Sequence, residues 1–350
     1  MYGLIRPLLF KLDPEQAHHL TLRAVALAGD ISLSRAALQA RYELNDPRLA
    51  VEAFGLRFRN PVGLAAGYDK DAAAVRGLSS LGFGHVEVGT VTCKSQAGNP
   101  KPRVWRVPTE SGLINSMGFP NAGVAALHVR RGDARLGINI GKGKDTPLEQ
   151  AAQDYCELFE KVYRDADYVT LNVSSPNTLG LRQLQAREAM QSLIGAVLAL
   201  RDRLTPRVPV LVKIAPDLNE AEIDDVLAVA IDKGIDGIIA TNTTISRAGM
   251  PEWAQGLKGG LSGAPLRDRA TEVIRYLARH MQGKLPIIGV GGIASGADAL
   301  DKMRAGATLV QVYTGLVYQG PGLVKRINQE LLRECERVGA RSVGELVGAG

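Results

Sequence analysis

The sequence predicts an α/β protein built on a (β/α)8 barrel of the TIM type with a small N-terminal helical extension. From residue 61 onward, short β-branched runs alternate with longer helical patterns. The strand runs are apolar throughout, as in a parallel sheet that is buried on both faces. Eight such runs occur, nearly all followed by a helix, and this number favours a closed barrel. A doubly wound open sheet is the alternative, but no GxGxxG turn follows the first strand.

The composition is that of a globular protein, with 45% hydrophobic and 22% charged residues and a formal net charge of +6 over 350 residues. Disorder, collagen and coiled coil are excluded as the main architecture. No basic run indicates nucleic-acid binding, and no apolar stretch reaches the ~18 residues of a membrane span. The cysteines Cys93, Cys156 and Cys335 are widely separated and odd in number, which indicates a reducing compartment. The absence of CxxC and HExxH motifs predicts no metal site.

The first 45 residues are predicted to be helical and to form a segment distinct from the catalytic barrel at 46–350. The first helix, 2–12, is strongly apolar and carries two basic residues and no acidic one. Asp13-Pro14 starts the second helix, because Asp is a good N-cap and Pro is favoured at the first helical position. A third helix at 32–42 is weaker. These helices are either a cap packed on the barrel or an element that lies on a membrane surface.

The barrel elements follow in order. Strands are predicted at 61–67, 85–91, 135–140, 167–173, 208–214, 237–241, 285–290 and 308–313. The helices between and after them are predicted at 71–81, within 147–163, and at 187–204, 220–233, 266–281, 295–305 and 321–338. Two connections are unusually long: 92–121, which is expected to carry a small hairpin, and 243–265. Long loops at the carboxyl ends of barrel strands are where substrate covers belong.

Active sites of such barrels form at the carboxyl ends of the strands. The strand ends of this chain supply two lysines with several amides and hydroxyls, and no histidine; Asp69 is the main carboxylate. The polar residues concerned are Lys70, Thr90, Asn139, Asn172, Lys213 and Thr241. This inventory argues against a metal held by carboxylates. Amides both donate and accept, so they suit a flat heterocycle, and lysines suit an anion or a ring that gains negative charge.

The last two strands carry a separate signal. Gly291-Gly292 and Thr314-Gly315 leave backbone N–H groups open where barrels commonly bind phosphate, although tight structural turns would give the same pattern. A phosphate site beside a flat polar pocket indicates FMN. Pyridoxal phosphate is the alternative, and Lys70 or Lys213 would then have to form the Schiff base.

Two residues are hard to explain without a partner. Lys213 and Asn139 each lie inside an apolar strand, and a polar group buried there must be hydrogen-bonded or paired. Ser175 stands before Pro176, and taken alone it would be an ordinary turn serine.

Ten segments, in register along almost the whole chain, resemble the class 2 (quinone-dependent) dihydroorotate dehydrogenases. They lie at 65–70, 89–92, 115–119, 137–142, 172–177, 212–216, 241–244, 259–263, 289–293 and 310–315. The segment at 12–18 is also similar to the helical extension of that family, which the shorter class 1 enzymes lack.

The resemblance implies oxidation of (S)-dihydroorotate to orotate in de novo pyrimidine (UMP) biosynthesis, with FMN taking the hydride. It implies that Ser175 is the base, where class 1 enzymes use a cysteine. Substrate contacts are implied for Lys70, Asn115, Ser116, Met117, Gly118, Phe119, Asn172, Asn177, Asn242 and Thr243. FMN contacts are implied for Ala66, Gly67, Tyr68, Asp69, Lys70, Thr90, Asn139, Asn172, Lys213, Thr241, Gly263, Gly292, Tyr313 and Thr314.

The resemblance also implies that a ubiquinone-type quinone reoxidises the flavin, with His18 and Arg106 at the quinone entrance. The enzyme is then expected to be a monomer attached peripherally to the cytoplasmic face of the inner membrane. Two alternatives stay open: an FMN barrel that oxidises or reduces a pyrimidine with a soluble acceptor, and a barrel without redox chemistry that binds a phosphorylated ligand.

Overall fold

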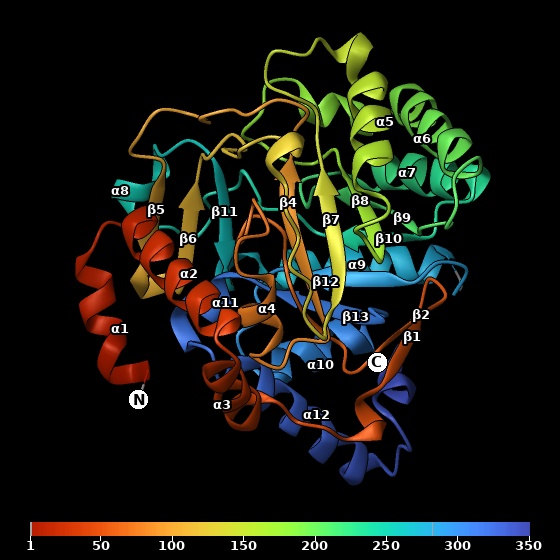
Figure 1. Ribbon diagram of the computed structural model, residues 1–350. Coiled ribbons are helices and arrows are strands. Elements are labelled where there is room, and N and C mark those ends of the chain that lie inside the picture. The colour runs from red at the N-terminus through yellow and green to blue at the C-terminus, as the bar shows by residue number, and fades with distance from the viewer. Residues whose placement is uncertain (1, 282) are drawn as a thin grey trace.

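A computed structural model describes residues 2–281 and 283–350, and its centre is a closed barrel of eight parallel strands (Figure 1). Each strand falls within its predicted range, so the predicted fold class is confirmed. The barrel strands are β3 (Val62–Leu64), β4 (His85–Val91), β7 (Arg135–Ile140), β8 (Tyr168–Asn172), β9 (Val210–Ile214), β10 (Gly237–Ala240), β12 (Ile287–Val290) and β13 (Leu309–Val312). Nearly all their residues are buried, because helices cover the outside and side chains fill the inside.

Helices surround the barrel and pack on one another in chain order. They are α4 (Val75–Ser79), α5 (Ala151–Val162), α6 (Arg187–Arg201), α7 (Glu220–Lys233), α9 (Arg267–Met281), α10 (Gly296–Arg304) and α12 (Leu323–Val338), with the short α8 (Glu252–Gln255) and α11 (Thr314–Gln319). The start of α7 shows why these boundaries hold. Asn219 accepts the Glu222 backbone N–H, and the Glu222 side chain accepts that of Asn219, which forms a capping box.

The predicted helix at 71–81 is shorter in the structure, where α4 covers only 75–79. The carboxylate of Asp69 accepts the backbone N–H groups of Ala73 and Ala74 at 2.9 and 2.8 Å. Ala72 has φ +57°, which a regular helix does not allow. The Asp69 side chain therefore keeps residues 71–74, which are predicted to form the first turn of the helix, in a loop.

Three helices precede the barrel, as predicted: α1 (Tyr2–Lys11), α2 (Pro14–Asp30) and α3 (Ser32–Tyr42). Asp13 caps α2 by accepting the backbone N–H groups of Glu15 and Gln16. The approach of α2 to α4 is close enough to require glycine on both sides. A Cβ at Gly29 would lie 2.3 Å from the backbone nitrogen of Gly77, and one at Gly77 would lie 2.0 Å from the carbonyl oxygen of Val25.

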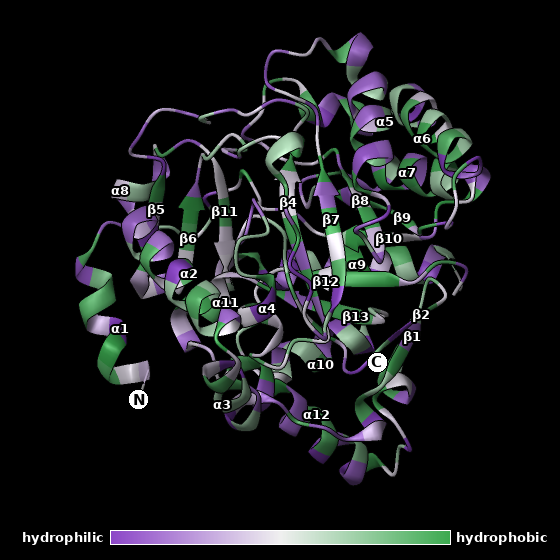
Figure 2. Cartoon of the chain, in the orientation of Figure 1, coloured by the Kyte–Doolittle hydropathy of each residue, from purple (hydrophilic) through white to green (hydrophobic). Residues whose placement is uncertain are grey.

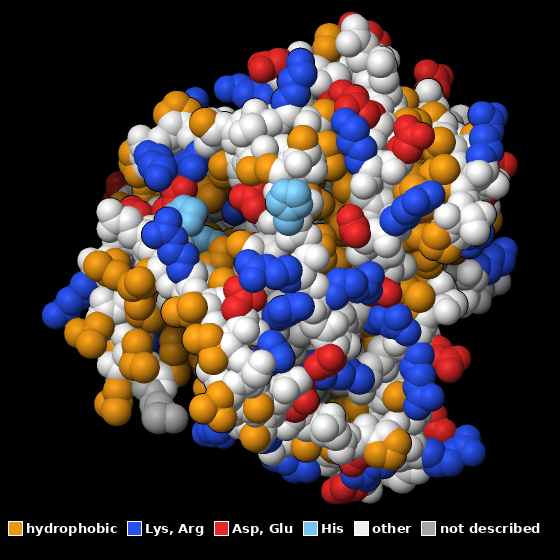
Figure 3. All heavy atoms as spheres, in the orientation of Figure 1, with side chains coloured by type: hydrophobic (Ala, Val, Ile, Leu, Met, Phe, Trp, Pro, Cys, Tyr) orange, Lys and Arg blue, Asp and Glu red, His pale blue; other side chains and the backbone are white. Residues whose placement is uncertain are grey.

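The N-terminal helices contain many hydrophobic residues (Figure 2), and several large apolar side chains among them are exposed (Figure 3). No residue of α1 is buried, and Figure 3 shows hydrophobic side chains gathered on the side of the molecule where α1 lies. We call the large exposed apolar residues of this segment the apolar face. They are Leu4, Ile5, Leu8, Leu12, Leu20, Leu27, Ile31 and Leu33. No helix within the described residues is long and apolar enough to cross a membrane.

A three-stranded antiparallel sheet covers the carboxyl end of the barrel. Its strands are β5 (Val104–Val107), β6 (Gly112–Asn115) and β11 (Gly260–Gly263), with β6 in the centre. The predicted hairpin in the first long connection is confirmed as β5–β6. The third strand comes from the second long connection, whose glycine-rich sequence gives no strand signal. Gly260 is needed there because a Cβ would lie 1.8 Å from Oγ1 of Thr243.

A second hairpin, β1 (Val51–Ala53) and β2 (Leu56–Phe58), lies near the opposite end of the barrel and is not predicted from the sequence. Each strand has three residues, which is too short for a periodic signal. Phe58 packs edge-on against His85 of β4, with the ring centroids 5.5 Å apart, and Phe54 lies 6.2 Å from Tyr168 of β8. The hairpin therefore closes the barrel with aromatic rings.

Candidate active site

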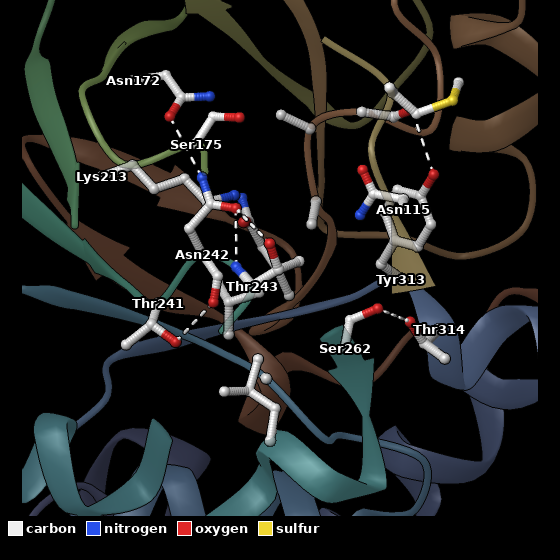
Figure 4. Close-up of a pocket in the computed structure, with 18 of the residues that line it drawn as sticks. Asn115, Asn172, Ser175, Lys213, Thr241, Asn242, Thr243, Ser262, Tyr313 and Thr314 are labelled. Carbon is white, nitrogen blue, oxygen red and sulfur yellow. Dashed lines mark hydrogen bonds between the residues drawn. The ribbon is translucent and has the colours of Figure 1, made fainter. Parts of the chain in front are cut away.

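A cavity of about 970 Å³ opens at the carboxyl ends of the barrel strands, at the upper end of the usual range for ligand sites (Figure 4). Most of the predicted site residues line it, although they come from distant parts of the chain. They are Ala66, Gly67, Lys70, Thr90, Asn115, Met117, Gly118, Phe119, Asn172, Ser175, Asn177, Lys213, Thr241, Asn242, Thr243, Gly263, Gly292, Tyr313 and Thr314. We call this the polar cavity.

Four of the residues predicted to contact substrate or FMN lie outside the wall of the polar cavity. Asn139 is buried beneath it and hydrogen-bonds to residues of the wall. Asp69 holds the loop before α4, and Tyr68 lines a second cavity described below. Ser116 contributes backbone contacts: its N–H donates to Arg103 and its carbonyl oxygen accepts from Asn99.

Amide and hydroxyl groups form a connected row along one side of the polar cavity. Thr90 Oγ1 donates to Asn139 Oδ1 at 2.6 Å, and Asn172 Nδ2 donates to Thr90 Oγ1 at 2.9 Å. Asn242 Nδ2 donates to Asn172 Oδ1 at 3.3 Å and to Ser174 Oγ at 3.0 Å. Each amide in this row has its orientation set by its neighbours, so the row offers fixed donors and acceptors to a ligand.

Ser175 comes from the loop that follows β8 and is 5% exposed, at the cavity wall. Its Oγ accepts the backbone N–H of Asn177 at 3.3 Å. Three residues further on, Thr178 is also buried, and its hydroxyl has no hydrogen-bond partner among the described residues. A second hydroxyl thus lies close to Ser175 in sequence with its hydrogen-bonding capacity unused.

The other end of the polar cavity is lined by glycines that no other residue could replace without strain. Gly263, Gly291 and Gly292 have φ of +93°, +126° and +75°. A Cβ at Gly292 would lie 2.5 Å from Cα of Arg267, and one at Gly263 would lie 2.2 Å from the carbonyl oxygen of Ser111. The first N–H groups of α11 have no intrahelical partner and suit an anion.

Two lysines face the polar cavity. Lys70 Nζ donates to the carbonyl oxygen of Gly67 at 2.7 Å, and burial lowers the pKa of Lys70 to about 8. Lys213 is 5% exposed, and burial also lowers its pKa, while the negative charge of Glu87 acts in the opposite direction. Both side chains are desolvated, and a desolvated ammonium interacts strongly with an anionic ligand.

A second cavity, of about 1280 Å³, lies between the N-terminal helices and the barrel. Its walls are mainly apolar, with side chains such as Leu9, Phe10, Leu78 and Leu316. We call it the apolar cavity. Four residues line both cavities, so the two meet there. They are Lys70, Asn115, Met117 and Tyr313.

His18 of α2 and Arg106 of β5 lie far apart in the sequence, but both line the apolar cavity. The guanidinium of Arg106 lies 4.7 Å from the ring centroid of Phe10 and donates to the carbonyl oxygen of Leu12 at 2.9 Å. His18 packs edge-on against Tyr68, and Tyr68 packs against Tyr313, with centroid separations of 4.9 and 5.6 Å. Burial lowers the pKa of His18 to about 3, so its imidazole is neutral at physiological pH.

Some cavity residues are missed by the sequence reasoning. Gln311 is polar within the apolar run of β13, which is the same signal that identified Asn139 and Lys213. Ser262, whose Oγ lies 2.8 Å from Thr314 Oγ1, comes from the unpredicted strand β11. Leu266 and Val290 are apolar residues of the cavity wall, and nothing in the sequence distinguishes them from core residues. Among the residues that the structure describes, no cluster of His, Cys, Asp or Glu could hold a metal ion.

The arrangement suits a flat, polar, anionic ring held beside a serine, with a phosphate-sized anion at the glycine-lined end. An apolar molecule that entered the apolar cavity would reach the same four shared residues from the other side.

The chain is similar to known proteins along almost its whole length. The family model described as Dihydroorotate dehydrogenase matches residues 48–335. A protein of Acidithiobacillus ferrooxidans named dihydroorotate dehydrogenase (quinone) is 51% identical, covering 94% of each chain. One of the same name from Thiobacillus denitrificans is 52% identical, covering 95% of this chain and 99% of that one. Ligand-free DHODH of Eimeria tenella superposes with a TM-score of 0.88 at 38% identity, covering 96% of this chain and 99% of the other. The crystal structure of the Eimeria enzyme in complex with ferulenol gives a TM-score of 0.87.

Proposed function

The chain belongs to the dihydroorotate dehydrogenase family, and from this premise we propose that it oxidises (S)-dihydroorotate to orotate in de novo pyrimidine (UMP) biosynthesis and passes the electrons to a quinone. One observation carries the proposal: a polar cavity and an apolar cavity meet at Lys70, Asn115, Met117 and Tyr313. The first has the chemistry that a charged pyrimidine requires, and the second has the chemistry that a lipid-soluble quinone requires.

FMN fits the donors and the shape of the polar cavity. Gly263 and Gly292 line one end of the cavity in backbone conformations that favour glycine, and Tyr313 and Thr314 line the same cavity and would hold the phosphate with them. Thr90, Lys213 and Thr241 would contact the ring or the ribityl chain, with Ala66, Gly67, Lys70 and Asn172 at its edge and Tyr68, Asp69 and Asn139 supporting from behind. When bound, FMN supplies a hydride acceptor.

The substrate carries a carboxylate and a ring of alternating carbonyl and N–H groups. Asn115, Asn172, Asn177 and Asn242 would pair with these groups, because an amide can donate to a carbonyl and accept from an N–H. Lys70 would bind the carboxylate, with Thr243 and the segment Ser116, Met117, Gly118 and Phe119 closing the pocket. Since the amides are already oriented by hydrogen bonds, little reorganisation accompanies binding.

Ser175 would remove the proton from C5 of dihydroorotate. A serine hydroxyl is a weak base at its ordinary pKa, so it needs an acceptor for its own proton and stabilisation of the enolate that develops. The unpaired hydroxyl of Thr178 supports a relay through a neighbouring hydroxyl or a water molecule. The two lysines supply positive charge close to the developing anion.

The N-terminal segment 1–45 would guide the quinone from a membrane to the barrel domain 46–350, with His18 and Arg106 at the entrance. The apolar face and the two basic residues of α1 support peripheral attachment to an anionic bilayer, on the cytoplasmic face of the inner membrane. We propose a monomeric enzyme. Deletion of residues 2–12 is expected to reduce binding to vesicles that contain anionic lipid, measured by co-sedimentation, while dihydroorotate still reduces the flavin. Unchanged vesicle binding would contradict the role of α1.

The activity is tested with the purified full-length protein. Its visible spectrum should show bound flavin, and dihydroorotate should reduce decylubiquinone. Turnover only with fumarate or NAD would contradict the quinone assignment, and a colourless protein that rejects added FMN would contradict the flavin assignment.

A further inference from the structure

Glu87 is a carboxylate in the interior of the barrel, on β4, and it is 0% exposed. It does not line the polar cavity. Burying a carboxylate is costly unless hydrogen bonds compensate, and here three donors do so. Asn139 Nδ2 donates to Oε1 at 2.9 Å, while Gln311 Nε2 and Tyr168 Oη donate to Oε2 at 2.9 and 3.1 Å. The donors come from three other strands of the barrel.

The carboxylate determines which way Asn139 points. An ionised carboxylate only accepts hydrogen bonds, so the amide nitrogen of Asn139 must face Glu87 and its oxygen must face the polar cavity. That oxygen accepts from Thr90 Oγ1 at 2.6 Å and from Asn172 Nδ2 at 3.2 Å. Asn172 Oδ1 in turn accepts from Asn242. One buried carboxylate thereby orients the row of amides along the cavity.

Glu87 also supplies a negative charge that acts on Lys213. The two lie in the barrel interior, on β4 and β9, and Glu87 is the charged group that opposes the effect of burial on Lys213. Among the neighbouring titratable groups, Tyr168 of β8 is neutral because burial raises its pKa, and β10 (Gly237–Ala240) carries none. Lys70 reaches the same cavity from the loop after β3, on the other side of the barrel from β9. Lys213 itself makes no ion pair among the described residues.

We propose that Glu87 is a positioning residue for the oxidation reaction: without touching substrate or flavin, it orients the Asn139–Asn172–Asn242 row and favours the protonated form of Lys213 at the cavity wall. Glu87 affects Lys213 through its negative charge. It orients the amides because a carboxylate can only accept hydrogen bonds. This role of Glu87 rests on the proposed function only in the test that measures the flavin potential.

The first test measures the charge of Lys213 directly and needs no flavin. The protein is labelled with ε-¹³C lysine, and the Lys213 resonance is identified by its loss in Lys213→Met. In Glu87→Gln, we expect the pKa of Lys213 to fall by about one unit or more, a tenfold change, because the compensating charge has been removed. Tyr168→Phe is the matched control, since it removes a hydrogen bond to Glu87 but leaves the charge. An unchanged pKa of Lys213 in Glu87→Gln would overturn the proposal.

A second variant keeps the proposal testable if Glu87→Gln does not fold. Glu87→Asp keeps the negative charge but shortens the side chain by one methylene, so the pKa of Lys213 should fall by a smaller amount in the same direction. An unchanged pKa of Lys213 in Glu87→Asp would contradict the proposal equally.

The second test uses the flavin midpoint potential of the holoenzyme between pH 6 and 9. If Glu87 acts through Lys213, Glu87→Gln lowers the potential relative to wild type at those pH values where the lysine titration of the first test shows that the variant has lost the Lys213 proton. This difference should disappear in the Lys213→Met background. A potential raised equally at every pH and in both backgrounds would mean that the Glu87 charge acts on the flavin directly, and would refute the role through Lys213. A protein that binds no flavin would refute the proposed function, while the lysine titration would still test Glu87.

Discussion

The side-chain amide of Asn177 donates two hydrogen bonds to Asn115, one to Oδ1 at 3.0 Å and one to the backbone carbonyl oxygen at 3.1 Å. Asn177 belongs to the loop after β8 that carries Ser175, and Asn115 ends β6 of the covering sheet. The candidate base and the cover over the cavity are therefore held together by one amide. Because Asn115 also lines the apolar cavity, this contact lies where the two cavities meet.

The first prediction concerns this pair. Asn177→Ala and Asn115→Ala should each lower kcat/KM for dihydroorotate by about 10- to 100-fold, since each removes one or two hydrogen bonds from a desolvated site. The double variant should lose less than the product of the two single effects, because the first substitution already breaks the contact. Steady-state kinetics of the four proteins measure the coupling. Strictly multiplicative losses would show that the two residues act independently.

The second prediction concerns the base. Ser175→Ala should lower turnover by about 10²- to 10⁴-fold, the usual contribution of general base catalysis, while the flavin stays bound. Ser174→Ala is the matched control: its hydroxyl donates to Asn172 Oδ1 but it does not line the cavity, so a loss of less than about tenfold is expected. Reduction of the flavin by dihydroorotate in a stopped-flow experiment separates this step from quinone reduction. Near-normal rates in Ser175→Ala would refute the assignment.

The third prediction concerns pH and ligand binding. Burial lowers the pKa of Lys70 to about 8, so Lys70 is cationic below that pH and neutral above it. The affinity for the orotate anion should therefore be highest below pH 8 and fall as pH rises through this value. Titration of the flavin spectrum with orotate from pH 6 to 10 measures it. In Lys70→Met the affinity should be low and should not show this transition; an identical transition there would assign it to another group.

The fourth prediction concerns stability in acid. His85 of β4 is fully buried, neither ring nitrogen has a hydrogen-bond partner among the described residues, and burial lowers its pKa to about 3. The folded state thus favours neutral imidazole, whereas the unfolded chain takes up a proton below pH 6.5. The stability that depends on neutral His85 is complete above pH 6.5 and falls by about 1.4 kcal/mol per pH unit as pH drops toward 3.

Denaturant unfolding at pH 6.5 and 4.5 tests this slope. When the pH is lowered from 6.5 to 4.5, the free energy of unfolding of His85→Leu should fall by about 2 kcal/mol less than that of the wild type, because leucine does not titrate. His280→Leu, at an exposed position of α9, should behave as wild type. If His85→Leu keeps the wild-type slope, the acid sensitivity comes from other groups.

The barrel could be predicted because it leaves a strong local signal. Each of the eight strands is a largely apolar run, and the two polar exceptions that the sequence singled out have buried partners in the structure. The charge of Glu87 acts on Lys213, and Asn139 hydrogen-bonds to both Glu87 and Thr90. The positions of most cavity residues followed from one rule, that chemistry gathers at the carboxyl ends of the strands.

The remaining features depend on contacts that sequence patterns do not carry. Strand β11 exists because it pairs with β6, which lies about 150 residues away, and two of its own 4 residues are glycine. The start of the helix after β3 is displaced by the Asp69 carboxylate. Glu87 stands between two valines and carries the same signal as Lys213 and Asn139, but its three donors lie on other strands, so its role depends on contacts that the sequence does not show.

The polar cavity and the apolar cavity share four wall residues, Lys70, Asn115, Met117 and Tyr313. A movement of one of these side chains that enlarges one cavity therefore reduces the other. Met117 and Tyr313 are the bulky members of this set, so a compound that fills the apolar cavity and turns either of them changes the space left on the polar side. Steric linkage of this kind is reciprocal. Compounds that bind in the apolar cavity would then change the apparent affinity for dihydroorotate without occupying the polar cavity. Substitutions of Met117 or Tyr313 that confer resistance to such compounds would also weaken the binding of the pyrimidine.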